Sequence, residues 1–191
     1  MPRHRFSDTR DRIERTAVRL FVKQGVTDTT VRDIAKALGL SEGALYRHFT
    51  SKDDLVWQLF EQHYVAFAAQ LRTLAEAQPT TRDKLAAMIR GFCRAHDEDP
   101  ERFHFLLFVQ HGQLHRLPGN ALTPVLAVRA VIDTGITRGE LPAQSADLAT
   151  ALVLGIVLQP MQFAAYGRLS RDMTSLAERL VTAAWAAVTT V

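Results

Sequence analysis

The sequence predicts an all-α protein of about nine helices in two parts, residues 1–52 and residues 53–191. Apolar residues recur at helical spacing through most of the chain, and the alternation and Asn-Gly or Asp-Gly turns typical of strands and hairpins are absent. In addition, three helix-capping residues and one turn glycine fall within residues 29–55. The first part is therefore expected to be a three-helix domain, and the second a larger helical domain.

The first helix is expected from about Ser7 to Gln24. Its apolar residues follow the spacing of one helix face, so that face is predicted to turn toward the core. The residues of this face are Ile13, Ala17, Leu20 and Phe21.

The capping signals specify two short helices joined by a tight turn, followed by a third helix. Thr30 is a good N-cap, and Asp33 stands at the capping-box position three residues later. Gly39 suits the left-handed residue that commonly ends a helix. Ser41 and Ser51 are two further N-caps, the first of which opens a short helix over about residues 42–48. This pattern predicts a helix-turn-helix, in which the second helix enters the DNA major groove.

The remaining elements are also helical, and proline, glycine and charged turns separate them. A break is expected at residues 96–100, where a charged stretch ends in a proline. The remaining helices are predicted at residues 52–77, 81–95, 101–111, 121–137, 145–166 and 174–187.

The first 55 residues resemble the TetR family of transcriptional regulators. The rest of the chain is similar to that family only in its length and helical pattern. The matching positions are Thr30, Val31, Asp33, Ile34, Ala35, Leu38, Gly39, Ser41, Gly43, Leu45, Tyr46, Phe49, Ser51, Lys52 and Leu55. This resemblance implies a DNA-binding regulator, most often a repressor that a small-molecule effector releases from a palindromic operator.

The charge distribution agrees with a DNA-contacting N-terminal part. Residues 1–50 carry 10 Lys and Arg against 6 Asp and Glu, whereas residues 51–191 carry 13 against 14. The positive net charge therefore sits with the helix-turn-helix, as expected of a module that approaches phosphates.

Candidate DNA contacts fall into two classes. Tyr46, His48, Lys52 and Thr30 are expected at phosphates or base edges, and the resemblance implies the same role for these positions. Sequence is expected to be read in the groove, where Ala44 can touch a thymine methyl. The full predicted set is Thr30, Ser41, Glu42, Gly43, Ala44, Tyr46, Arg47, His48 and Lys52.

The middle helices are rich in aromatic residues and histidines, most of which are expected to fill the core. The resemblance also implies a largely apolar ligand cavity with a few polar groups, for a small apolar or aromatic effector. Pro160 is predicted to kink its helix and open space beside that cavity. The candidate lining residues are His63, Phe67, Phe92, His96, Phe108, Gln159, Gln162 and Tyr166.

A palindromic site demands a two-fold dimer, and the last two helices carry the best candidate face. Small and apolar residues form a stripe on each helix, although both stripes also suit an internal core. The candidate interface residues are Leu148, Ala151, Leu152, Gly155, Ile156, Leu176, Leu180 and Ala184.

Other classes of function find less support. Nucleophile elbows, phosphate loops and zinc-protease motifs are absent, so we expect no enzyme and no cofactor. His111 and His115 are four residues apart, but no cysteine or carboxylate accompanies them at the spacing of a metal-binding motif, so no metal site is expected. A ligand-independent helix-turn-helix regulator remains the alternative, and a small helical enzyme is the less favoured one.

We expect a cytoplasmic protein that does not bind membranes. A lone cysteine, Cys93, cannot form an internal disulfide, which favours a reducing compartment. The N-terminal residues are charged and do not resemble a signal peptide. The apolar run from Ala151 to Leu158 is expected to be too short to span a bilayer.

Overall fold

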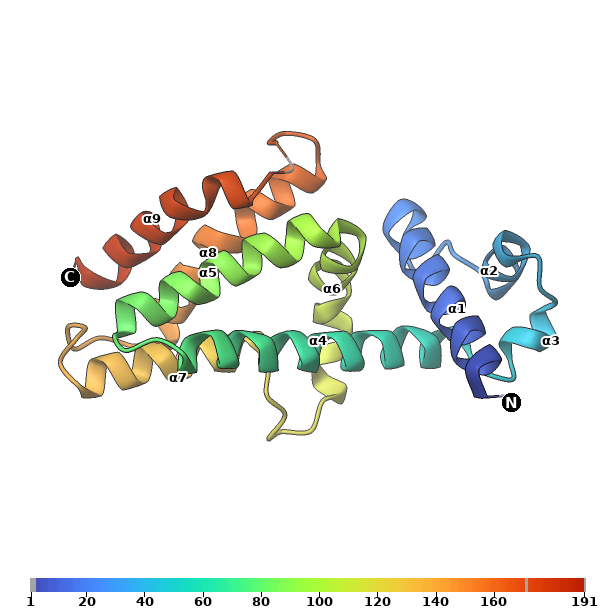
Figure 1. Ribbon diagram of the computed structural model, residues 1–191, viewed down its shortest axis with the longest axis horizontal. Helices are drawn as coiled ribbons and strands as arrows, with labels where there is room; N and C mark the ends of the chain where they lie inside the picture. The colour runs from blue at the N-terminus through green and yellow to red at the C-terminus, as the bar shows by residue number, and fades with distance from the viewer. Residues whose placement is uncertain (1–2, 171, 191) are drawn as a thin grey trace. The chain divides into compact units, whose positions relative to one another are not determined.

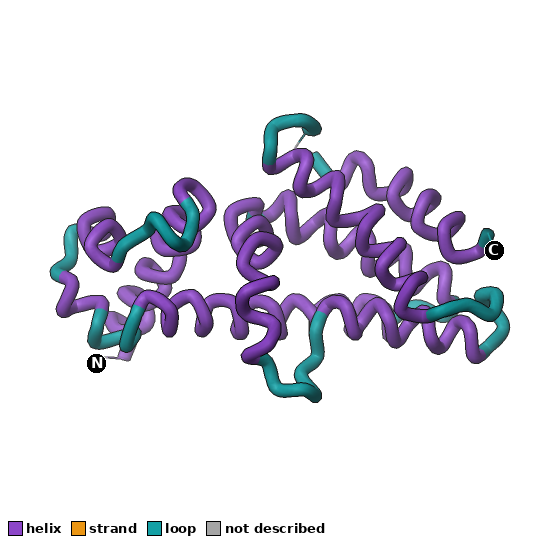
Figure 2. The backbone as a smooth tube through the Cα atoms, turned by 180° about the vertical axis from the view of Figure 1, so that it is seen from behind, coloured by secondary structure: helices purple, strands orange, loops and turns teal. Residues whose placement is uncertain are grey.

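The computed structural model describes residues 3–170 and 172–190, with side chains from Thr9 onward. Every regular element in these ranges is helical, with nine α-helices and two short 3₁₀ helices joined by loops (Figure 2). This confirms the all-α prediction. The chain forms two compact units, which we call unit 1 (Met1–His63 with Glu101–Leu117) and unit 2 (Tyr64–Pro100 with Pro118–Val191).

Unit 1 contains the predicted three-helix motif and, in addition, a later helix (Figure 1). Ile13, Ala17 and Phe21 are buried as predicted, and Leu20 is half-buried. The Phe105 ring stacks on the Phe21 ring with centroids 5.9 Å apart, which joins the later helix to the first one. The helices of unit 1 are α1 (Arg3–Gln24), α2 (Val31–Leu38), α3 (Glu42–Leu45), the first half of α4 (Lys52–Glu76), α6 (Pro100–Gln113) and η1 (Leu114–Arg116).

Unit 2 is a bundle in which α8 packs against α7 and α9, and α5 packs against the same two helices. A glycine permits one close approach, because a Cβ at Gly135 would lie 2.6 Å from Cγ2 of buried Thr81. The Thr81 amide donates to the Glu140 carboxylate at 2.6 Å, which ties the start of α5 to the turn after α7. The helices of unit 2 are the second half of α4, α5 (Thr81–Glu98), α7 (Pro124–Thr137), α8 (Ala146–Ala165), η2 (Thr174–Leu176) and α9 (Ala177–Thr189).

The predicted break at residues 96–100 is smaller than expected. Helix α5 continues to Glu98 and α6 begins at Pro100, so only Asp99 separates them. Asp97 lies within α5, and its carboxylate accepts the amides of Met173 at 2.9 Å and Thr174 at 2.7 Å. Although burial of Asp97 opposes ionisation, these hydrogen bonds and one from His96 hold its pKa below the ordinary value.

The boundary between the units also differs from the one predicted at residue 52. Helix α4 is continuous across it, and residues 101–117 belong to unit 1. The physical reason is a set of contacts far apart in sequence, such as the stacking of Phe105 on Phe21, which local patterns do not reveal.

Helix α8 extends beyond the apolar run in residues 151–158 at both ends. Among the described residues it is the one helix that is long and apolar enough to cross a membrane by length and composition. Only 33% of its apolar stretch is buried within the protomer, so an apolar face of α8 is exposed.

The candidate dimer residues divide between this exposed face and the core. On α8, Leu148 is 61% exposed and Leu152 is 42% exposed. On α9, by contrast, Leu180 and Ala184 are buried within unit 2, so their assignment to a surface stripe was wrong. They face inward because α9 packs onto α5 and α8 through this side. Of the remaining candidates, Ala151 and Gly155 are exposed, and Ile156 and Leu176 are half-buried.

Candidate nucleic-acid interface

The turn between α2 and α3 is fixed by backbone and capping hydrogen bonds. Thr30 is extended and its hydroxyl accepts the Asp33 amide, while the Asp33 carboxylate accepts the Thr30 amide at 2.9 Å. Gly39 then takes a left-handed conformation with φ of 67°. The Ser41 hydroxyl accepts the Ala44 amide at 3.3 Å and opens α3. The predicted capping box and turn are therefore confirmed.

Helix α3 is shorter than predicted, since it ends at Leu45 rather than near His48. The chain continues in turns, in which the amides of His48 and Phe49 both donate to the Leu45 carbonyl at 2.8 and 3.1 Å. Leu45 and Phe49 are buried, and they anchor this segment to the core of unit 1. Residues 46–48 are therefore held between two buried side chains.

Most of the predicted DNA contacts share an exposed surface on α3 and the turn that follows it. Tyr46 is 52% exposed, an unusual position for a large aromatic side chain. Gly43 has nothing within 4 Å of the place where a Cβ would stand. Ser41, Glu42, Gly43, Tyr46 and Arg47 are exposed, and Ala44 and His48 are half-buried.

Thr30 is occupied by its own capping box. Its hydroxyl donates to the Asp33 carboxylate at 2.6 Å, so this hydroxyl hydrogen is already used. The hydrogen bonds from Thr30 keep the pKa of Asp33 below its ordinary value, with smaller help from Lys36 and Arg32. The donors that remain for an anion at this end of α2 are the amides of its first turn.

Lys52 has a structural role that the sequence did not indicate. Its ammonium donates to the carbonyl oxygens of Val26 at 2.7 Å, Thr29 at 2.9 Å and Thr27 at 3.2 Å. An ammonium has three hydrogens, so this turn between α1 and α2 can use all of them. Lys52 therefore fixes the segment that places α2.

A second network, also missed by the sequence analysis, ties α1 to the start of α4. Arg10 donates to Gln58 at 2.7 Å, and Gln58 donates to Asp54 at 2.8 Å. Asp54 accepts the Thr50 amide at 2.8 Å, so the chain of bonds ends at the turn after α3. The hydrogen bonds from Gln58 and Thr50 hold the pKa of Asp54 below its ordinary value. The spacing of four residues between Asp54 and Gln58 places both on one helix face, so the sequence could have predicted the bond between them.

The end of α6 makes a third tie within unit 1. Arg116 in η1 donates to Asp53 at 3.0 Å, and its guanidinium lies 4.5 Å from the centre of the Trp57 ring. Both partners belong to the first two turns of α4, and the pairing spans about 60 residues of sequence. No local sequence pattern predicts a contact between residues so far apart.

The structure does not bring all candidate ligand residues to one place. In unit 2, the Phe67 and Phe92 rings meet edge to face at 5.0 Å, and Phe92 is buried. His96 is also buried, with Nδ1 3.0 Å from the Asp97 carboxylate. Farther along α8, Gln162 donates to the Tyr166 hydroxyl at 2.8 Å, and this pair lies beyond exposed Gln159.

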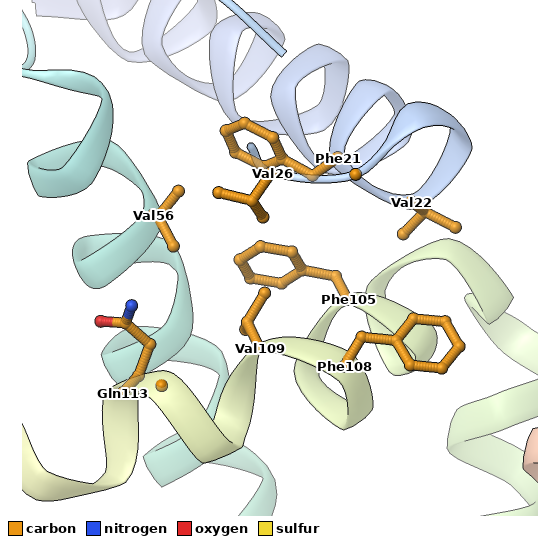
Figure 3. Close-up of a pocket in the computed structure, with 10 residues that line it drawn as sticks. Phe21, Val22, Val26, Val56, Phe105, Phe108, Val109 and Gln113 are labelled. Atoms are coloured by element: carbon orange, nitrogen blue, oxygen red, sulfur yellow. The ribbon is translucent and has the colours of Figure 1, made fainter. Parts of the chain in front are cut away.

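Two of the candidates, His63 and Phe108, belong to unit 1 instead. Phe108 is 44% exposed and lines a cavity of about 420 Å³ on the α1 side of α6 (Figure 3). Within the described ranges, no three His, Cys, Asp or Glu side chains are grouped so that they could hold a metal ion together.

Comparison with known proteins agrees with this helix-turn-helix. Residues 13–59 match the family model of bacterial regulatory proteins of the tetR family. The chain is 46% identical over 59 residues to the HTH-type transcriptional regulator AcrR of Shigella flexneri, covering 29% of this chain and 27% of that protein. It is 30% identical over 101 residues to the HTH-type transcriptional repressor KstR2 of Mycobacterium tuberculosis, covering 53% and 48%. These matches span about a quarter to a half of the relatives' length.

Solved structures extend the likeness of the fold to nearly the whole chain. The regulator FadR of Bacillus subtilis, solved in complex with stearoyl-CoA, has a TM-score of 0.74 at 20% identity and covers 94% of this chain and 98% of its own. The TetR family regulator PfmR of Thermus thermophilus has a TM-score of 0.69 at 23% identity, with 89% and 97% covered. Residues 13–59 therefore resemble the DNA-binding domain of the tetR family, and the fold of nearly the whole chain is similar to that of solved regulators of this family.

The role of Lys52 can be tested through stability. We expect Lys52→Ala to lower the free energy of unfolding of unit 1 by about 1–3 kcal/mol, because three carbonyls lose their donor. Urea unfolding followed by Trp57 fluorescence in a Trp185→Phe background reports unit 1 alone, because the chain has two tryptophans. Lys36→Ala, an exposed lysine of α2, is the matched control. Equal unfolding of the two variants contradicts the role.

Proposed function

We propose that the protein is a DNA-binding transcriptional repressor that binds a palindromic operator as a homodimer and is released by a small, largely apolar ligand. The observation that carries the proposal is the helix-turn-helix of unit 1, whose exposed surface presents Tyr46 and Arg47 from a segment anchored by buried Leu45 and Phe49. The match of residues 13–59 to the family model of bacterial regulatory proteins of the tetR family supports the same conclusion. The protein then acts in the cytoplasm, where the DNA is, and has no enzymatic role.

Phosphate and base contacts are assigned from side-chain chemistry and exposure. The Tyr46 hydroxyl can donate to a phosphate, and half-buried His48 is within the same segment. In the groove, Arg47 suits the two acceptors of guanine, Glu42 the amino group of cytosine, and Ala44 the methyl of thymine. Gly43 lets the backbone approach, since no side chain separates it from the DNA. Ser41 caps α3, and Thr30 and Lys52 support the site through the α2 cap and the turn before it.

The dimer is proposed on the exposed face of α8. A two-fold axis there pairs identical apolar stripes, as an isologous interface requires. Leu148 and Leu152 are exposed in the protomer, and the small residues Ala151 and Gly155 on the same helix face let two helices approach closely. An exposed apolar stripe of this kind is a typical sign of an interface.

Two relatives support a repressor with an apolar effector. KstR2 is named a transcriptional repressor, and FadR was solved with stearoyl-CoA, a molecule with a long apolar chain. In this chain the proposed effector site lies in unit 2, where Phe67 and Phe92 supply an apolar wall. His96 and the Gln159, Gln162 and Tyr166 end of α8 supply polar groups.

Release follows from differential binding. A ligand lowers DNA affinity only if it prefers a conformer whose two helix-turn-helix motifs do not match the half-site spacing. Helix α4 runs without interruption from Lys52 to Glu76, so Phe67 and Lys52, which directly follows the helix-turn-helix segment, lie on one continuous helix. This continuity is the physical route that we propose for coupling.

DNA binding is tested with the duplex flanking the protein's own gene, by fluorescence anisotropy at several salt concentrations. We expect Tyr46→Phe to weaken operator and random DNA about 3- to 10-fold alike, because one phosphate hydrogen bond is lost. Arg47→Ala is expected to lower only the preference for operator, by about 1–3 kcal/mol, because a base contact is lost. Arg72→Ala, an exposed cation of α4 in unit 2, is the control. If both variants bind like the control, the contact assignments fail.

The dimer is tested with Gly155→Arg. A side chain at this position meets nothing within 4 Å in the protomer, so the fold is expected to survive while the charged group blocks the α8 face. Sedimentation should then show a monomer, and operator affinity should fall steeply. Gln70→Arg, on an exposed position of α4, should remain dimeric. A dimeric Gly155→Arg variant would move the interface elsewhere.

The effector is sought by thermal shift with a panel of aromatic compounds and fatty acyl thioesters, followed by titration against labelled operator. We expect at least one stabilising compound to lower operator affinity by roughly 5- to 150-fold, the range of typical allosteric coupling. Phe67→Trp should blunt this response without weakening operator binding, because it fills space beside Phe92. The alternative of a ligand-independent regulator is favoured if no stabilising compound changes operator affinity.

A further inference from the structure

A cavity lies within unit 1, and it shares no lining residue with the effector site proposed in unit 2. Its volume is about 420 Å³, within the range of small-molecule pockets. In Figure 3, Phe105 extends from α6 toward Phe21 and Val26, Val56 approaches from α4, and Phe108 lies on the far side of Phe105. The lining residues are Phe21, Val22, Gly25, Val26, Val56, Phe105, Phe108, Val109, Gly112 and Gln113.

Two glycines keep the cavity open. A Cβ at Gly112 in α6 would meet nothing within 4 Å, and the same holds for Gly25 in the turn after α1. Gly112 lies inside a helix, where glycine is unfavourable relative to alanine. The space that it leaves, together with the 44% exposed Phe108 ring, forms an accessible apolar wall.

Gln113 supplies a polar group at the edge of this wall. Its side-chain oxygen accepts from Arg116 at 3.0 Å, which fixes the orientation of the amide. Its NH₂ group makes no hydrogen bond within the part of the chain that the structure describes, and in Figure 3 its nitrogen lies on the side toward Val56. The cavity therefore offers one donor group, the Gln113 NH₂, to an occupant and is otherwise mainly apolar.

We propose that this cavity binds a compact, mainly apolar molecule that carries one acceptor oxygen, such as a bicyclic ketone. The aliphatic and aromatic walls take the hydrocarbon part, and the Gln113 amide donates to the oxygen. The site touches the DNA-binding motif directly, because Val26 both lines the cavity and accepts a hydrogen bond from Lys52. It does not depend on the effector site in unit 2.

The test uses the full-length protein with labelled valine methyl groups and two probes, 1-tetralone and the hydrocarbon tetralin. We expect 1-tetralone to shift the methyl signals of Val22, Val26, Val56 and Val109 in a saturable way. Val153 and Val157, buried in α8 of unit 2, should not shift. Tetralin should bind about 3- to 10-fold more weakly, because it lacks the acceptor for Gln113.

Matched variants separate the cavity from the surface of α6. Gly112→Leu should abolish the shifts by filling the cavity, whereas His111→Leu, an exposed neighbour outside the lining, should retain them. Three results would overturn the site. They are shifts confined to unit 2, unchanged binding by Gly112→Leu, and the absence of a saturable shift below about 1 mM of probe, which corresponds to a binding free energy weaker than about 4 kcal/mol. Equal affinity for the two probes would remove the acceptor oxygen from the ligand class.

Discussion

The arrangement of unit 1 depends on the ammonium of Lys52, the first residue of α4. It donates to three carbonyl oxygens, those of Val26, Thr27 and Thr29, in the turn between α1 and α2. One side chain therefore holds together the end of α1, the approach to α2 and the start of α4. The position of α2, and of the turn and α3 that follow it, is fixed relative to α4 through this contact.

Two further sets of hydrogen bonds also hold other elements of unit 1 against the first turns of α4. The Arg10–Gln58–Asp54 chain joins α1 to the first turns of α4 and ends at the Thr50 amide, just after α3. Arg116 joins η1 to Asp53 on the same turns. The acidic residues sit where the positive end of a helix favours them, so α4 gains a favourable dipole interaction as well as its partners. Elements from both ends of unit 1 thus converge on one helix terminus.

Local features of the fold could be predicted from the sequence, because they depend on neighbouring residues. The Thr30–Asp33 box, the left-handed Gly39 and the cap at Ser41 are contacts within a few residues, and all three are present. The α3 segment is shorter than predicted, since periodicity does not distinguish a helix from consecutive turns.

Features that depend on distant residues could not be predicted. The apolar stripe of α9 was read as a surface, but Leu180 and Ala184 pack inside the protomer, and periodicity alone cannot tell which partner covers a face. Lys52 was expected at phosphate because it opens a long helix, and its bonds to carbonyl oxygens could not be predicted, since those partners lie more than 20 residues away. The cavity in unit 1 combines α1, α4 and α6, so no single segment of sequence carries its signal.

The hydrogen bonds of Lys52, Arg10 and Arg116 also affect how a DNA-binding regulator of this kind could change its DNA affinity. Because Lys52, Arg10 and Arg116 join α1, the turn after it, η1 and the start of α4, a disturbance that reaches unit 1 displaces these elements together rather than one by one. Tyr46 and Arg47 then keep their geometry relative to each other, since buried Leu45 and Phe49 hold their segment. In the proposed release, the half-site preference of each protomer would be conserved while the spacing between two protomers changes. Affinity for a palindrome can therefore fall without any change in which bases each half reads.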